Sequence, residues 1–348
     1  MSSTITALPA PLTPDPAAAP PLRWGILGTG VIARHMADSL HNHTRQVVAA
    51  VGSRSAERAQ QFADDKGVPH AYGSYDELVA DPDIDIIYVA SPHSEHAAHA
   101  TLALNAGKPA LVEKAFARNQ AEAQQIVDAA KAAGVPVMEA IMTRHTPALS
   151  IVTQLIDTGE LGTIDTILAD HGQNLIHVPR MVRPDLAGGA LLDLGIYCVQ
   201  LAVFLGGLPQ QVSASGSLTD AGVDAHDAIA FSGFTKLPAA LAALHTTMLS
   251  NTPIEAIIAG SEARIKLSGP FTSGSAHVRF ETKDGACLDA DIEGVTNQQA
   301  LCYEAAHFAQ LVADGGLDSP VMPAQESVAI MGLLDAVRAQ VGVRYPGE

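Results

Sequence analysis

The sequence predicts an α/β fold in which a doubly wound parallel sheet is followed by an α+β domain with an open, mostly antiparallel sheet. Two observations lead to this prediction. Up to residue 141, short apolar runs alternate with helical patterns, as parallel strands and their crossover helices do. Beyond residue 211, extended segments separated by turn signals follow one another without intervening helices, which indicates antiparallel pairing.

The first predicted domain spans residues 22–141. Its strands are short apolar runs such as VVAAV and IDIIYVA, which are typical of parallel strands buried on both faces. They are expected at 24–27, 47–51, 84–90, 110–112 and 135–140. Helices are expected over 31–40, 55–66, 94–105 and 119–134, and the Ser74-Tyr75-Asp76-Glu77 capping box opens one more.

The second predicted domain spans residues 142–348. It starts with a helix over 146–157, a strand over 163–171 and a long apolar helix over 189–205. Extended segments are then expected near 211–219, 227–235, 239–249, 254–268, 276–283 and 286–292. The last helices, about 297–313 and 324–341, are expected to pack back toward the first domain. Helices can cover one face of the sheet, and the other is either the interface of a homodimer, or of a dimer of dimers, or a polar solvated face.

The composition narrows the classes of partner. A chain of 348 residues with 47% hydrophobic and 16% charged residues is globular and long enough for two domains. Its formal net charge of −17 argues against nucleic acid or an anionic membrane surface as a partner. An anionic cofactor would therefore need cationic side chains close to it.

Three cysteines without CxxC spacing suggest neither a disulfide framework nor a zinc site. No uninterrupted run of eighteen apolar residues exists, so we expect no membrane span. Residues 1–21 are rich in proline and alanine and lack the features of a secretory signal. We expect them to form a disordered tail or an arm, and we expect the protein to be cytoplasmic.

A glycine turn opens the first domain. In the stretch 23–33 (RWGILGTGVIA), an apolar run leads into Gly28-Thr29-Gly30, and a helical pattern follows. This order is typical of a dinucleotide-binding, or Rossmann, turn, in which the helix N-terminus receives the pyrophosphate. An ordinary tight turn is the alternative. We expect the cofactor to contact Gly28, Thr29, Gly30, Val31 and Ile32.

The end of the second strand indicates which dinucleotide is bound. A chain that prefers NAD carries an acidic residue there, whereas this chain has Ser53 and Arg54, with Arg58 one helical turn later. These groups can bond a 2′-phosphate, so we expect NADP to bind more tightly than NAD. A solvated arginine at a helix start is the alternative.

Lys114 ends the strand that begins at residue 110, where ligands bind outside the carboxyl ends of such sheets. A solvent-facing lysine is the alternative, which the neighbouring Glu113 and the apolar residues before it make less favourable. A lysine beside a nicotinamide suits proton exchange with a substrate hydroxyl.

Asp193 and Tyr197 lie four residues apart in the apolar stretch LLDLGIYCVQL, so a helix would place them on one face. An aspartate in such surroundings must be paired or lie in a pocket. Alternatively, Asp193 caps a buried backbone group and Tyr197 belongs to the core.

His93, His96 and His99 follow the strand at 84–90 in three-residue steps. These steps drift around a helix, and no carboxylate has matching spacing, so we expect no metal site. His96 is instead expected near the cofactor. Ser91, His93 and Glu113 complete the expected cofactor contacts at this edge of the sheet.

These motifs resemble the Gfo/Idh/MocA oxidoreductase family. The resemblance covers about residues 22–345 and is closest in MEAIMTRHTPAL (138–149), MVRPDLAGGALLDLGIYCVQL (181–201) and 319–346. These stretches resemble the branch of dimeric dihydrodiol dehydrogenases and related NADP-dependent sugar dehydrogenases and reductases. Two positions depart from the pattern, because Ala115 replaces the proline of the family's Glu-Lys-Pro motif and Met142 replaces a tryptophan common in the branch.

The resemblance implies roles for individual residues. Lys114 would be the catalytic lysine, and Asp193 and Tyr197 would lie beside the substrate. Arg144 and Arg180 match positions near the cofactor ring and the substrate pocket.

The predicted function is an NADP-dependent oxidoreductase acting on a secondary alcohol or ketone of a sugar, cyclitol or cyclic diol. The alternative is a non-catalytic, NADP-sensing regulatory protein, because the family also contains a transcriptional co-repressor. The retention of Lys114 and Tyr197 favours the enzyme.

Overall fold

The computed structural model describes residues 5–292, 294–295 and 297–348, which divide into two compact units. The parallel-sheet unit contains residues 14–142 and 298–331. The mixed-sheet unit contains the described residues of 1–13, 143–297 and 332–348. Residues 1–4 of the predicted tail lie outside the described residues. Further along it, Leu12 donates its backbone N–H to Ser150 Oγ at 2.8 Å, within the mixed-sheet unit.

Six parallel strands form the sheet of the first unit, in the order β3-β2-β1-β4-β5-β6. This order confirms the predicted doubly wound sheet. Strands β4, β5 and β6 are buried at every residue, as expected for parallel strands covered on both faces. The strands are β1 (Arg23–Leu27), β2 (Val47–Gly52), β3 (His70–Tyr72), β4 (Ile86–Val89), β5 (Ala110–Glu113) and β6 (Val137–Ala140).

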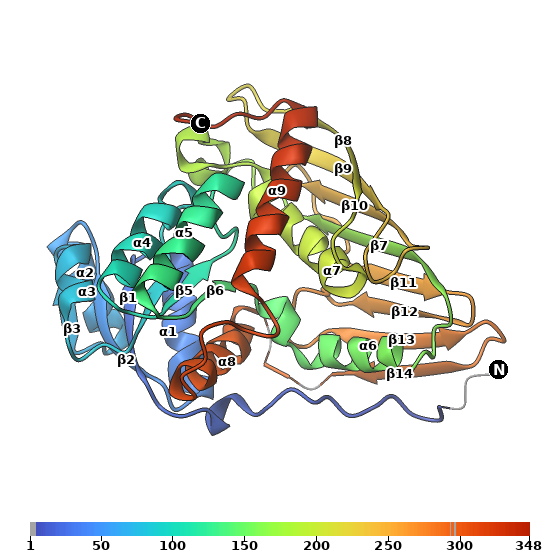
Figure 1. The fold of residues 1–348 in the computed structure, drawn as a ribbon, viewed down its shortest axis with the longest axis horizontal. Coiled ribbons are helices and arrows are strands. Elements are labelled where there is room, and N and C mark those ends of the chain that lie inside the picture. The colour runs from blue at the N-terminus through green and yellow to red at the C-terminus, as the bar shows by residue number, and fades with distance from the viewer. Residues whose placement is uncertain (1–4, 293, 296) are drawn as a thin grey trace. The chain divides into compact units, whose positions relative to one another are not determined.

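Helices of this unit form two groups, because α1 contacts α2 and α8, whereas α4 contacts α3 and α5 (Figure 1). Their ends follow local sequence signals. Ser74 accepts the N–H of Glu77 as the capping box predicts, and Gly67 and Gly134 end their helices in the left-handed conformation. The helices are α1 (Val31–His43), α2 (Ala56–Lys66), α3 (Tyr75–Ala80), α4 (His96–Asn105), α5 (Gln120–Ala133) and α8 (Leu301–Ala313).

The mixed-sheet unit contains an eight-stranded sheet in the order β14-β13-β12-β11-β7-β10-β9-β8. Strands β7 and β10 pair in parallel and the other neighbours pair antiparallel, which confirms the mostly antiparallel prediction. The strands are β7 (Ile164–Gly172), β8 (Gln211–Leu218), β9 (Asp224–Ser232), β10 (Leu241–Thr247), β11 (Ala256–Gly260), β12 (Ala263–Ser268), β13 (His277–Thr282) and β14 (Cys287–Asp291).

One face of this sheet is covered by helix α7 (Ile196–Gly206), which contacts β7 and β10. A single π-helical turn, Leu191–Gly195, precedes α7. The unit also contains α6 (Pro147–Asp157). Helix α9 (Ala324–Val341) begins among the residues of the first unit and ends among those of the second.

The stretch Pro184–Gly206 is long and apolar enough to cross a membrane, with a mean hydropathy of 1.7. The sequence predicts no membrane span here, because Asp185 and Asp193 interrupt the apolar run. In the structure, 89% of its most apolar window is buried inside the protein. Core helices meet the same criterion, so the stretch is weak evidence for a membrane span.

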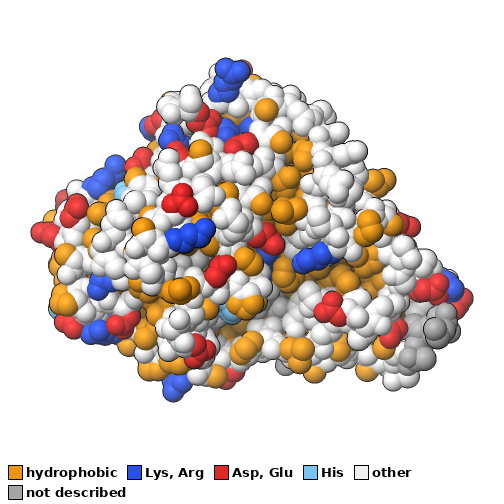
Figure 2. Space-filling view, in the orientation of Figure 1, with side chains coloured by type: hydrophobic (Ala, Val, Ile, Leu, Met, Phe, Trp, Pro, Cys, Tyr) orange, Lys and Arg blue, Asp and Glu red, His pale blue; other side chains and the backbone are white. Residues whose placement is uncertain are grey.

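On the molecular face shown in Figure 2, Lys and Arg side chains stand singly among acidic and apolar ones.

Candidate active site

The glycine turn connects β1 to α1 at the carboxyl edge of the parallel sheet. Gly28 has a φ of 115°, and a Cβ at this position would lie 2.7 Å from the carbonyl oxygen of Ala90. Both the left-handed backbone and the close neighbour therefore require glycine. Its N–H donates to the carbonyl of Gly52 at 2.9 Å, which ties the turn to β2.

Gly30 is the N-cap residue of α1 and has no side chain to satisfy the first N–H groups of the helix. A Cβ on Gly30 would meet no atom within 4 Å, so this glycine leaves open space in front of the helix N-terminus. Thr29 and Ile32 are half-buried and Val31 is exposed beside this space. Unsatisfied N–H groups facing open space fit a dinucleotide pyrophosphate, with Gly28 to Ile32 as the residues that would hold it.

Ser53 and Arg54 follow the last residue of β2, where the second ribose of a dinucleotide is expected. Ser53 is buried and its Oγ accepts the N–H of Ser55 at 3.3 Å. The side chains of Arg54 and Arg58 are exposed. Burial raises the pKa of Tyr75, and the nearby positive charge of Arg54 opposes this rise. The positively charged guanidinium of Arg54 therefore lies close to Tyr75, near the carboxyl end of β2.

Lys114 is half-buried directly after β5, and the Lys114–Ala115 peptide bond is cis. Two histidines hold the backbone of this segment. His93 Nε2 lies 3.2 Å from the carbonyl oxygen of Lys114, and His96 Nδ1 lies 2.8 Å from that of Ala115. The predicted histidines thus contact the backbone around the lysine.

His96 is fully buried, and its second nitrogen, Nε2, lies 2.8 Å from the carbonyl oxygen of Ser91. Burial and the nearby His93 lower the pKa of His96 to about 3, so the ring is neutral at pH 7. A neutral imidazole donates only one hydrogen, so His96 donates to one of its two carbonyl neighbours. It links the end of β4 to the segment that follows β5.

Three buried glutamates lie beneath this segment. Glu113 accepts a hydrogen bond from the hydroxyl of Tyr88. Glu139 accepts the N–H of Phe116 at 3.0 Å and the hydroxyl of Ser327 at 2.9 Å. Burial is the largest cause that raises the pKa of Glu304 well above its usual value, and the negative charges of Glu113 and Glu139 raise it further. Its carboxyl group therefore holds its proton to a higher pH than an ordinary glutamate does. Sequence reasoning missed both Glu304 and Glu139.

In the mixed-sheet unit, Asp193 lies in the π-helical turn and is paired with Arg180. The guanidinium donates Nη1–H to Oδ1 at 2.9 Å and Nη2–H to Oδ2 at 3.1 Å. The Asp193 side chain is 9% exposed and that of Arg180 is 54% exposed. This bidentate pair joins two residues that were predicted separately as substrate contacts.

Tyr197 lies in the first turn of α7, with its ring 5.1 Å from that of His171. His171 is buried near the end of β7, and sequence reasoning missed it because nothing in its local pattern marks it. Arg144 is buried with its guanidinium 5.0 Å from the ring of Phe204 on α7.

The predicted residues therefore fall into two sets. Those that end or follow β1, β2, β4 and β5 lie along one edge of the parallel sheet. They are Gly28, Thr29, Gly30, Val31, Ile32, Ser53, Arg54, Arg58, Ser91, His93, His96, Glu113 and Lys114. The second set lies in the mixed-sheet unit and comprises Arg144, Arg180, Asp193 and Tyr197.

Comparison with known proteins identifies the family. Residues 22–141 match the profile of the oxidoreductase family with an NAD-binding Rossmann fold, and residues 150–266 match the GFO/IDH/MocA C-terminal domain. Trans-1,2-dihydrobenzene-1,2-diol dehydrogenase from Homo sapiens is 35% identical over 333 residues, which are 94% of this chain and 99% of the relative. The chain belongs to the Gfo/Idh/MocA oxidoreductase family. The enzyme of the same name from Danio rerio is 37% identical over 332 residues, which are 93% of this chain and 98% of that one.

Two solved structures of oxidoreductases are similar to this chain. KijD10, a 3-ketoreductase from Actinomadura kijaniata solved in complex with NADP and TDP-benzene, has a TM-score of 0.81 at 26% identity and covers 92% of this chain and 98% of its own. Aldose-aldose oxidoreductase from Caulobacter crescentus has a TM-score of 0.80 at 24% identity, covers 93% and 98%, and is similar in fold. The predicted family is thus confirmed, and the chain is an NAD(P)-dependent dehydrogenase or reductase acting on CH–OH groups.

Proposed function

We propose that this enzyme uses NADP to interconvert a secondary alcohol and the matching ketone on a sugar, cyclitol or cyclic diol. The position of Lys114 carries the proposal. It follows β5 at the sheet edge where the Gly28–Gly30 turn follows β1, and only β4 lies between these two strands. A dinucleotide held at that turn extends along this edge, toward the lysine.

The preference for NADP rests on the end of β2. Ser53 and the exposed Arg54 stand where an NAD-binding chain carries a carboxylate. Ser53, Arg54 and Arg58 would hold the 2′-phosphate through hydrogen bonds and charge. In a protein with a net charge of −17, such a local cation also offsets the repulsion of an anionic cofactor.

Lys114 and Tyr197 are the proposed proton carriers. When bound, NADP supplies the acceptor or donor of the hydride. Oxidation of a carbinol also releases the hydroxyl proton, which a side chain within hydrogen-bond reach must accept. Lys114 is the proposed acid–base group, and Tyr197 relays the proton or holds the substrate oxygen. Asp193, which accepts hydrogen bonds from Nη1 and Nη2 of Arg180, orients the substrate.

The proposed substrate class rests on the relatives and on the polar pair. The curated relatives are named for a cyclic diol, and KijD10 is a 3-ketoreductase bound to a TDP compound. A bidentate arginine–carboxylate pair suits orientation of neighbouring hydroxyl groups. Met142 is buried at the position where the family branch carries a tryptophan, so the proposal leaves the substrate class wider than the aromatic diol of that branch.

A substrate panel tests this proposal. Trans-dihydrodiols, aldoses, cyclitols and ketosugars are each mixed with enzyme and NADP or NADPH, and the absorbance of NADPH is followed. Turnover of at least one polyhydroxylated ring compound is expected, with NADP preferred over NAD. Tight binding of NADP without turnover of any compound would favour the non-catalytic sensor instead.

A further inference from the structure

We propose that Tyr345 and Asp224 are positioning residues for the Arg180–Asp193 pair, and that they act by fixing the turn formed by Gly188–Leu191. This inference rests on the proposed function, in which the pair orients the substrate. Both residues lie far in sequence from the turn, and neither belongs to the predicted site. The turn is defined here as the segment from Gly188 to Leu191, which leads into the π-helical turn that carries Asp193.

The turn packs directly on the backbone that carries Arg180. A Cβ on Gly188 would lie 2.5 Å from the carbonyl oxygen of Arg180 and 2.6 Å from that of Met181. The N–H of Gly188 donates to the carbonyl of Arg183 at 3.0 Å. A displacement of the turn would therefore move Arg180 and Asp193 relative to each other, because one precedes the turn and the other follows it.

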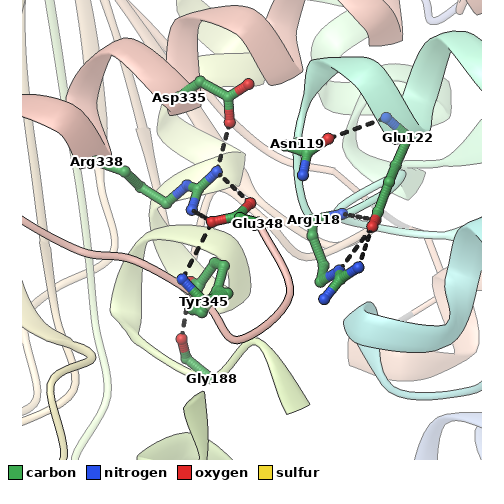
Figure 3. A network of polar contacts seen from close by, with 8 residues as sticks. All are labelled: Arg118, Asn119, Glu122, Gly188, Asp335, Arg338, Tyr345 and Glu348. Atoms are coloured by element: carbon green, nitrogen blue, oxygen red, sulfur yellow. Dashed lines mark hydrogen bonds and ion pairs between the residues drawn. The ribbon is translucent and has the colours of Figure 1, made fainter. Parts of the chain in front are cut away.

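Tyr345 holds the first residue of the turn. Its hydroxyl donates to the carbonyl oxygen of Gly188 at 2.9 Å, and the residue is almost completely buried (Figure 3). Burial raises the pKa of Tyr345 well above its usual value, so the hydroxyl keeps the proton that it donates. This bond connects two points that are 157 residues apart in the chain.

Tyr345 is itself locked by a buried arginine. The guanidinium of Arg338 lies 4.7 Å from the centre of the Tyr345 ring and pairs with Glu348 through Nη1 at 2.7 Å and Nη2 at 2.9 Å. Glu348 also accepts the backbone N–H of Tyr345 at 3.1 Å, and Asp335 accepts Nη2–H of Arg338 at 2.6 Å (Figure 3). These contacts leave the Tyr345 ring little freedom, so its hydroxyl is a fixed point for the turn.

Asp224 holds the other end of the turn. It is fully buried, and its Oδ2 accepts the N–H of Leu191 at 2.5 Å. Gly189 has a φ of 121°, and a Cβ on it would lie 2.2 Å from Asp224 Oδ1. The carboxylate thus fits against a glycine that no other residue can replace. Its neighbour Asp227 is buried too and interacts directly with the carboxyl group of Asp224.

Hydrogen exchange tests the positioning itself without any substrate. Tyr345→Phe removes one oxygen and leaves the ring against Arg338, and Asp224→Leu replaces both carboxyl oxygens, including the acceptor of the Leu191 N–H, by methyl groups of similar size. The amides of residues 189–195 should exchange roughly tenfold faster in each variant, the change that loss of one net hydrogen bond produces. The matched control is Tyr72→Phe, whose lost hydroxyl bonds Asp81 in the other unit. This control should exchange as wild type does in the segment 189–195.

Kinetics then tests whether the positioning serves the reaction. Tyr345→Phe should lower kcat/KM for the best substrate about tenfold, mainly through KM, with the Kd for NADP unchanged. In the background of Asp193→Asn, Tyr345→Phe should have no further effect, because both act on one pair.

Three results would overturn the inference: unchanged exchange in Tyr345→Phe, faster exchange with unchanged kcat/KM, or additive losses with Asp193→Asn. If wild-type enzyme turns over no compound of the panel, the proposed function fails, and the exchange comparison alone decides whether Tyr345 and Asp224 fix the turn. Asp224→Leu is the variant more exposed to misfolding, and Tyr345→Phe keeps the test open in that case.

Discussion

Arg54 is an exposed cation at the end of β2, where a 2′-phosphate would lie in a bound NADP. Arg54→Ala should weaken NADP binding by roughly 1.5–3 kcal/mol, the value of a charge-assisted hydrogen bond, and leave NAD almost unchanged. Titration of both dinucleotides into wild type and variant measures the two affinities. Equal losses for NADP and NAD would show that Arg54 does not recognise the 2′-phosphate.

The buried carboxyl group of Glu304 should make the free energy of unfolding depend on pH. Its raised pKa means that, above its usual 4.5, the folded protein binds a proton that the unfolded chain has already lost. The free energy of unfolding therefore falls as pH rises from about 4.5 toward the raised value. Glu304→Gln removes this titration, so urea unfolding at about pH 5 and about pH 8 should show a smaller loss in the variant.

The exposed Glu57 supplies the control for this experiment, since Glu57→Gln removes a surface carboxylate of the same unit. Its unfolding should keep the wild-type dependence on pH. An identical dependence in Glu304→Gln would show that the buried carboxyl does not titrate in this range.

At the residue scale, sequence reasoning located groups that follow strands and missed groups brought in from afar. Lys114 and Ser53 were predicted because strand ends are visible in the apolar pattern. Asp224 and Tyr345 were not, because their contacts with the turn at Gly188 join points 33 and 157 residues apart. Spacing along the chain contains no information about such contacts.

At the scale of elements, the two glycines of the β1–α1 turn have separable roles. Gly28→Ala forces a Cβ into the left-handed region and against Ala90, so it should cost about 1–3 kcal/mol of stability in the protein without cofactor. Gly30→Ala places a Cβ in open space at φ −72°, so stability should stay near wild type. That Cβ would lie where the pyrophosphate binds, so NADP affinity should fall at least tenfold.

Thermal unfolding and NADP titration of both variants check this division of roles. Loss of stability in Gly30→Ala, or unchanged NADP affinity in it, would contradict the assignment of Gly30 to the pyrophosphate. Unchanged stability in Gly28→Ala would contradict the packing argument at Ala90.

Most elements were predictable because caps and periodicity are local. The exceptions have local causes. Strand β3 has three residues, too few for an apolar pattern, and the segment predicted at 254–268 forms two strands, β11 and β12, because the chain turns between Gly260 and Ala263. The helix expected over 189–205 starts with a π-helical turn at Leu191–Gly195, which no spacing rule indicates.

At the scale of the whole molecule, we predict that two copies of the chain associate through the face of the mixed sheet opposite α7. Leu241 and Leu168 are 62% and 40% exposed on the adjacent strands β10 and β7. Exposed leucines on central strands favour burial against a second copy of the chain. Sedimentation should give a dimer at micromolar concentration, and Leu241→Lys should give a monomer.

Leu317 is 64% exposed in the other unit and provides a matched control, because Leu317→Lys adds the same charge at an equally exposed leucine. It should leave the dimer intact. A monomeric wild type, or dissociation by both substitutions alike, would remove the predicted role of the sheet face.

The central claim is that Lys114 exchanges the proton that accompanies hydride transfer, and turnover of Lys114→Ala tests it most directly. The panel's best substrate is assayed with saturating NADP, after titration has shown that the variant still binds the dinucleotide. Loss of a general acid–base should lower kcat by about a hundredfold to ten-thousandfold. Retention of more than about a tenth of wild-type kcat would contradict the assignment. The proton would then pass to Tyr197, whose replacement by phenylalanine would show the large loss instead.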